Sequence, residues 1–146
     1  MFIKQLSVFV ENRRGKLTEI TELLASKGID MRALSLADSS EFGLLRLIVS
    51  DPDAGFKCLR EAGMMVRMGE VIAVGVDDRP GGFAKAARLI SDAGVDLTYL
   101  YALSSRKDGE AVIIMRLDQP GEGIAALRKD GFRIISPEEI YRQDLQ

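Results

Sequence analysis

The chain of 146 residues contains no histidine and only one cysteine, Cys58. Without histidine, a Ser-His or Cys-His nucleophile pair, a histidine general base and a histidine-ligated zinc site are all excluded. A single cysteine cannot form an internal disulfide or a Cys-x-x-Cys redox pair, which suits a reducing compartment. We therefore expect a protein that is not an enzyme and that carries no cofactor.

The sequence also lacks a basic excess and a long apolar run. Lys and Arg number 20 against 22 Asp and Glu, and the isoelectric point is near 5.3. This balance is not that of a typical nucleic-acid-binding protein. No stretch approaches the about 20 apolar residues of a membrane-spanning helix, and the opening Met1–Lys4 does not begin a signal peptide. We expect a soluble, cytoplasmic protein that binds neither nucleic acid nor membranes.

What the chain does contain is an internal repeat. The segment Asp78–Phe83 repeats Asn12–Leu17, which lies 66 residues earlier. An alternating apolar stretch precedes each copy, and an apolar pattern of helical period follows it. A repeat of this length indicates that one structural unit occurs twice in the chain.

Each half of the chain predicts the order βαββαβ. In the first half, the expected strands and helices are Ile3–Val10, Gly15–Ser26, Asp30–Ala37, Leu44–Ser50, a helix beginning at Asp51, and Met64–Met68. In the second half they are Val71–Val76, Gly81–Asp92, Leu97–Leu103, Ala111–Leu117, Gly123–Lys129 and Phe132–Ile135. The repeat spacing grows from 66 to 68 residues in the second half, and we place the two extra residues in the turn 106–109 and in 118–121.

The predicted fold class is α+β, with two ferredoxin-like βαββαβ units, at residues 1–69 and 70–146. Each unit has an antiparallel four-stranded sheet with its helices on one face. A unit of about 70 residues has a marginal core by itself, so we expect the two units to pack side by side.

The loop Asp78–Gly82 is the stronger of the two candidate binding loops. It joins a strand to a helix, where free backbone N–H groups and the positive end of the helix dipole favour a carboxylate or phosphate. Gly81 and Gly82 carry no side chain that blocks a close approach, and Asp78 can accept hydrogen bonds from an ammonium. An α-amino acid carries both groups. The alternative is that the two glycines only permit a tight turn.

The first copy of the loop, Asn12–Lys16, lacks the proline and the second glycine. Its Arg14 and Lys16 either reach an anion directly or are solvated surface charges.

Each half has an aspartate at the start of its second strand, Asp30 and Asp96, just after a helix-ending glycine. Aspartate favours such corners because it bonds its own backbone, and the alternative is that each acid lies near a binding loop. Tyr99 and Tyr101 make one side of the second half's strand aromatic, either for packing or for lining a ligand pocket.

These motifs resemble the ACT domain, a small regulatory module of amino-acid-metabolising enzymes. Val74–Phe83 followed by Ala93–Leu97 is similar to one ACT domain, and Leu6–Leu17 with Lys27–Met31 is similar to a second. Together the two copies cover essentially the whole chain. The resemblance implies ferredoxin-like units, side-by-side pairing and, in many members, an amino acid bound between domains.

In the family, the ligand is held by the strand-to-helix loop of one domain and the start of the second strand of another. Family members often have asparagine where Asp30 and Asp96 stand, and commonly Pro-Gly where Arg14-Gly15 stands. The ligand-binding residues that the resemblance implies here are Asn12, Arg14, Gly15, Lys16, Leu17, Asp30, Met31, Asp78, Arg79, Pro80, Gly81, Gly82, Phe83, Asp96, Leu97 and Tyr99.

Two functions follow from this resemblance. The first is a non-catalytic sensor that binds an amino acid or a similar small zwitterion, and that forms a homodimer. The second is a regulatory subunit that docks on an enzyme of amino-acid metabolism, since Leu6–Leu17 also resembles the small regulatory subunit of acetolactate synthase.

Overall fold

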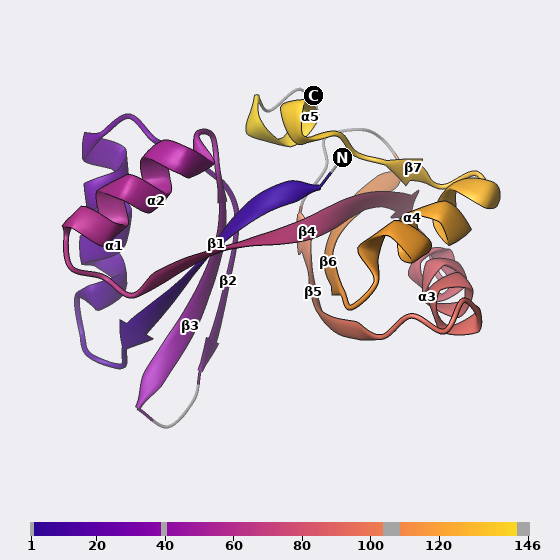
Figure 1. Ribbon diagram of the computed structural model, residues 1–146, viewed down its shortest axis with the longest axis horizontal. Coiled ribbons are helices and arrows are strands. Elements are labelled where there is room, and N and C mark those ends of the chain that lie inside the picture. Colours follow the sequence, from indigo (N-terminus) through magenta and orange to yellow (C-terminus); the bar gives the residue numbers. More distant parts are fainter. Residues whose placement is uncertain (1, 39–40, 104–108, 143–146) are drawn as a thin grey trace. The chain divides into compact units, whose positions relative to one another are not determined.

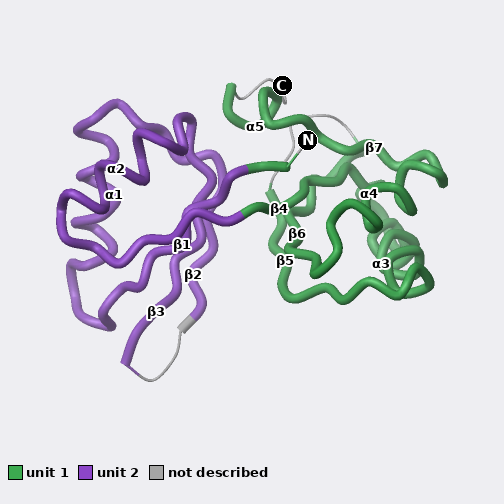
Figure 2. The backbone as a smooth tube through the Cα atoms, in the orientation of Figure 1, with its two compact units in different colours: residues 1–3, 70–146 green, residues 4–69 purple. Residues whose placement is uncertain are grey.

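The protein is described by a computed structural model that covers residues 2–38, 41–103 and 109–142. The chain forms two compact units (Figure 2), one of Lys4–Gly69 and the other of Met1–Ile3 with Glu70–Gln146. The predicted turn at 106–109 falls mostly outside the described residues. No helix within the described ranges is both long enough and apolar enough to cross a membrane.

The unit Lys4–Gly69 has the order βαββαβ (Figure 1). Its elements are β1 (Ile3–Glu11), α1 (Lys16–Ser26), β2 (Met31–Asp38), β3 (Phe42–Val49), α2 (Pro52–Glu61) and the first residues of β4 (Val66–Asp77). The strands lie in the order β2-β3-β1-β4, and β3 is antiparallel to both of its neighbours. The unit therefore has the ferredoxin-like sheet that the sequence predicts.

Alternation along β1 separates the two faces of this sheet. Leu6, Val8 and Val10 are buried in a core that includes Ile20 and Leu24 of α1. The intervening residues point to the opposite face because successive strand side chains alternate.

The helix ends of this unit follow from local chemistry. Gly28 closes α1 with a φ of 71°, a left-handed conformation that glycine adopts without steric cost. The Asp51 carboxylate caps α2 by accepting a hydrogen bond of 3.1 Å from the Ala54 N–H, as the sequence predicts.

The unit that contains Glu70–Gln146 repeats this plan and adds one helix. Its elements after the remainder of β4 are α3 (Gly82–Asp92), β5 (Leu97–Leu103), β6 (Glu110–Leu117), α4 (Pro120–Lys129), β7 (Arg133–Ile134) and α5 (Pro137–Tyr141). The strands lie in the order β7-β4-β6-β5, and a second core collects apolar residues of β4, β6, α3 and α4.

Three expectations from the sequence need correction. The strands predicted at 64–68 and 71–76 are a single strand, β4, because the residues between them keep an extended conformation. Helix α5 was not predicted. Both extra residues of the second half lie between Leu103 and Glu110, and none lies in 118–121, because Leu34 and Leu100 are still 66 residues apart whereas their sheet partners Leu47 and Met115 are already 68 apart.

Candidate functional site

A cavity of about 630 Å³ lies where β4 ends and α3 begins. Four segments of the unit Glu70–Gln146 line it: the end of β4, the loop and first turn of α3, the start of β6, and the residues between α4 and β7. The cavity therefore includes the stronger of the two loops that the sequence singled out.

The loop leaves the first turn of α3 without a side-chain cap. Gly81 occupies the cap position with a φ of 89°, and no side chain accepts a hydrogen bond from the N–H groups of this turn. Gly82 lies so close to the preceding strand that an added Cβ would stand 1.9 Å from the carbonyl oxygen of Asp77. Uncapped N–H groups at the positive end of a helix favour a negatively charged group.

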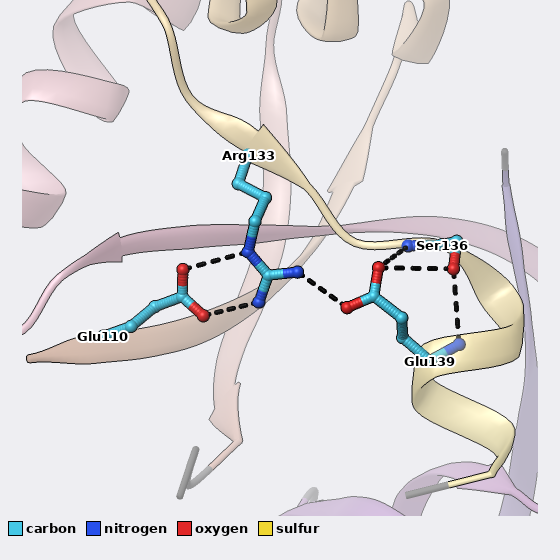
Figure 3. A network of polar contacts seen from close by, with 4 residues as sticks. All are labelled: Glu110, Arg133, Ser136 and Glu139. Carbon is cyan, nitrogen blue, oxygen red and sulfur yellow. Dashed lines mark hydrogen bonds and ion pairs between the residues drawn. The ribbon is translucent and has the colours of Figure 1, made fainter. Parts of the chain in front are cut away.

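On the other side of the cavity, Arg133 joins two carboxylates (Figure 3). Its Nε and Nη2 donate hydrogen bonds of 3.1 and 2.6 Å to Glu110, and its Nη1 donates one of 2.6 Å to Glu139 of α5. Gly75 makes room for this arrangement, because a Cβ at Gly75 would lie 2.5 Å from Glu110 Oε2. Arg133 thus connects a wall of the cavity to the C-terminal helix.

Protonation equilibria reflect this network. The hydrogen bond to Glu110 raises the pKa of Arg133, against the opposing effect of burial, and Glu139 adds to the increase. Burial alone would raise the pKa of Glu139, but the hydrogen bonds from Arg133 and from the Ser136 backbone lower it further than burial raises it. Both groups are therefore held in their charged forms.

Formal charges balance around the cavity. Asp77, Glu110 and Asp130 line it together with three cations, Arg79, Lys85 and Arg133. Arg79 pairs with Asp77 at 3.1 Å, and Arg133 pairs with Glu110. The side chains of Lys85 and Asp130 form no ion pair or hydrogen bond with another residue in the described part of the chain. One positive and one negative group thus remain available to a ligand.

Only part of the predicted second loop lines this cavity. Arg79, Pro80, Gly81 and Gly82 are lining residues, whereas Asp78 and Phe83 are not. The Asp78 N–H donates to the carbonyl oxygen of Gly109, and Phe83 packs against the core.

The predicted residues of the second strand lie elsewhere in this unit. Asp96 and Leu97 line a different cavity, of about 330 Å³, beside the C-terminal end of α3, and Leu97 also packs against the core. Helix α3 has 11 residues, which correspond to a length of about 16 Å. Tyr99 is half-buried on β5, beyond Leu97. The unit does not gather these residues around the loop 79–82.

In the unit Lys4–Gly69, the first loop has a similar backbone but different side chains. Gly15 has a φ of 89° and, like Gly81, begins a helix without a side-chain cap. Lys16 forms an ion pair of 3.4 Å with Glu19, and Leu17 packs against the core. Arg14 is exposed.

The other predicted residues of this unit have structural partners. The Asn12 N–H donates to the carbonyl oxygen of Glu41, and Asp30 forms an ion pair with Arg32. Met31 packs against the core. Their ligand-binding roles remain predictions.

Sequence reasoning missed Lys85, Glu110, Asp130 and Arg133. Lys85 was within reach, because it lies one helical turn after Gly81 and its N–H donates to the carbonyl oxygen of Gly81. Glu110, Asp130 and Arg133 come from segments that only the folded sheet brings to the loop. Helix α5 did carry a local signal, since Ser136 and Glu139 form a capping box, which has a recognisable sequence pattern.

Comparisons with known proteins agree with this architecture. A family model described as an ACT domain pair matches residues 1–141. The crystal structure of protein BT0572 from Bacteroides thetaiotaomicron is similar over 97% of both chains, with 34% identity and a TM-score of 0.91.

More distant structures share the fold. The regulatory subunit of aspartate kinase from Thermus thermophilus is 12% identical, with a TM-score of 0.66 over 88% of this chain and 92% of that chain. The corresponding subunit from Thermus flavus is also 12% identical, with a TM-score of 0.62 over 86% of this chain and 90% of that chain. The search of curated proteins found no match.

Proposed function

This chain belongs to the family of ACT domain pairs, and from that premise we propose that it is a non-catalytic regulatory protein that binds an α-amino acid. The observation that carries the proposal is the cavity beside α3, which combines an uncapped helix N-terminus with two charged groups of opposite sign, Lys85 and Asp130. An α-amino acid presents a carboxylate and an ammonium within one small molecule. Its charges match those that the cavity offers.

The carboxylate of the ligand belongs at the first turn of α3. Backbone N–H groups near Gly81 and Gly82 are available there, and Lys85 lies one turn further along the helix. Hydrogen bonds to an ionised acceptor are about twice as strong as those between neutral groups. Lys85 adds a charge that a backbone turn alone does not supply.

The ammonium of the ligand belongs at the acidic side of the cavity. Asp130 ends α4 and has no ion-pair partner among the described residues, whereas Asp77 already pairs with Arg79. We assign the ammonium to Asp130, with Asp77 as a second acceptor. This replaces the earlier expectation for Asp78, which does not line the cavity. The predicted roles of Asp30, Met31, Asp96, Leu97 and Tyr99 stay open.

Isothermal titration calorimetry against each of the twenty L-amino acids tests this proposal. We expect heat and saturable binding with at least one of them, at micromolar to millimolar concentration. Uniform silence at millimolar amino acid would remove the sensor function.

A second candidate function is docking on an enzyme of amino-acid metabolism. Leu34 of β2 and Leu100 of β5 favour it, because they occupy corresponding positions on edge strands and are 50% and 40% exposed. Exposed edge strands are ready to pair with another chain. Purification of the tagged protein from native extract distinguishes the two functions: a stoichiometric enzyme partner supports docking, and a homodimer without a partner supports sensing.

A further inference from the structure

The two units can be compared position by position, because the same backbone hydrogen bonds recur in both. The Glu19 N–H donates to the Gly15 carbonyl as the Lys85 N–H donates to the Gly81 carbonyl. Ala62 ends α2 as Asp130 ends α4. Each lining residue of the cavity therefore has a defined counterpart in the unit Lys4–Gly69.

Both free charges of the cavity are lost in the counterpart. Glu19 stands in place of Lys85, which reverses the charge, and Ala62 stands in place of Asp130. Lys16 occupies the place of Gly82 and forms an ion pair of 3.4 Å with Glu19. The helix start in this unit thus presents an acid where a ligand carboxylate would approach.

The wall formed by Glu110 and Arg133 is also replaced. Phe9 pairs with Leu44 in the sheet as Gly75 pairs with Val112, so Phe9 is the counterpart of Gly75. By the same comparison Phe42 replaces Glu110 and Met65 replaces Arg133. Phe9, Phe42 and Met65 are 42%, 45% and 70% exposed, so this surface is apolar where the other unit is ionic.

We propose that the amino acid binds to the unit containing Glu70–Gln146 and not at the corresponding place of the unit Lys4–Gly69, so that each chain holds one molecule in a site of this kind. Lys85 and Asp130 decide which copy binds. The physical reason is that a zwitterion placed against an apolar surface loses hydration without gaining polar partners. This inference rests on the proposed function, and it adds the number of sites and the residues that select between them.

Nuclear magnetic resonance on the full-length ¹⁵N-labelled protein tests the inference. An equimolar mixture of the twenty L-amino acids at millimolar concentration is the probe. We expect the amide resonances of residues 81–85 to shift in a saturable way, and those of residues 15–19 to stay in place. Saturable shifts at 15–19 would overturn the inference while leaving the sensor function intact. The absence of shifts at both loops would overturn the sensor function and the inference together.

Exchange of the selecting residues provides a second test. The double variant Lys85→Glu with Asp130→Ala carries the residues of the other copy at two exposed positions, so we expect it to fold and to lose the shifts at 81–85. The matched control, Glu19→Lys with Ala62→Asp, changes the same positions in the other unit and should leave those shifts unchanged. Retained shifts at 81–85 in the first double variant would show that neither residue selects the copy.

Discussion

Single residues of the cavity have separable roles. Lys85 contributes charge from an exposed position, so its replacement affects binding without disturbing the core. Gly82 contributes space, because no side chain fits between the start of α3 and the Asp77 carbonyl. The two positions therefore predict different outcomes, one in affinity and one in stability.

Reversal of charge at Lys85 should weaken binding of the amino acid that calorimetry identifies. For Lys85→Glu we expect an affinity lower by about tenfold, since an exposed ion pair contributes up to about 1 kcal/mol and the new acid repels the carboxylate. The control is Arg88→Glu on the same helix, whose side chain is 77% exposed and outside the cavity lining. Equal losses in both variants would show that only the general field of α3 matters.

Addition of one methyl group at Gly82 should destabilise the protein. The Cβ of Gly82→Ala would overlap a backbone oxygen, so the loop must shift, and we expect a loss of about 1–3 kcal/mol in the free energy of unfolding by urea. The control is Gly121→Ala in the first turn of α4, where no atom lies within 4 Å of the added Cβ. Gly121→Ala should be neutral or stabilising by up to about 1 kcal/mol. Equal stabilities for the two variants would contradict the steric account.

Among the secondary-structure elements, α5 depends most on side-chain chemistry. It has five residues, too few for a stable helix by itself. The capping box of Ser136 and Glu139 fixes its start, and the ion pair with Arg133 links it to β7 (Figure 3). Ile140 is fully buried. Loss of the Glu139 charge should therefore loosen this helix first.

Acid should weaken the attachment of α5. The pKa of Glu139 is lower in the folded protein than in the unfolded chain, so its contribution to stability is complete above the unfolded pKa of about 4.3 and disappears as pH falls through the lower folded value. The Ile140 methyl resonance, followed by nuclear magnetic resonance, should change in this acid range.

At neutral pH, Glu139→Gln should already loosen α5, with a cost of about 1 kcal/mol. The control is Glu138→Gln, an exposed residue of the same helix for which the described structure shows no ion pair. An unchanged Ile140 resonance in Glu139→Gln at neutral pH would show that burial of Ile140 alone holds the helix.

On the scale of the whole molecule, the repeat places a leucine at the same position of each edge strand. Leu34 and Leu100 each lie on the helix-bearing face of their sheet, opposite Leu47 and Met115. An apolar side chain on an unpaired edge promotes association with another chain. Both the homodimer and the enzyme-docking proposals draw on this feature.

Charge on the edge strands should weaken self-association. We expect Leu34→Glu with Leu100→Glu to shift the protein from dimer to monomer in sedimentation velocity at micromolar concentration. Met65→Glu is the control, because Met65 is 70% exposed but lies outside β2 and β5. If the double variant remains dimeric, the edge strands are not the association surface.

Much of this structure could be predicted from the sequence. The alternation along β1, the helical period after Gly15 and Gly81, and the closing glycine Gly28 are local patterns, and each correctly indicates its element. The continuity of β4 was not predictable, because Gly69 looks like a break, although the sheet holds it in an extended conformation. Tertiary pairing overrides local propensity at such positions.

The sequence by itself determined the duplication, the ferredoxin-like order of each unit and the glycine loop that leaves a helix start uncapped, because all of these depend on residues close together in the chain. The tertiary structure decided which side chains meet that loop. Glu110, Asp130 and Arg133 reach it from β6, α4 and β7 through the pairing of β4 with β6 and with β7. Long-range register brings these charges together, and no local pattern records that register.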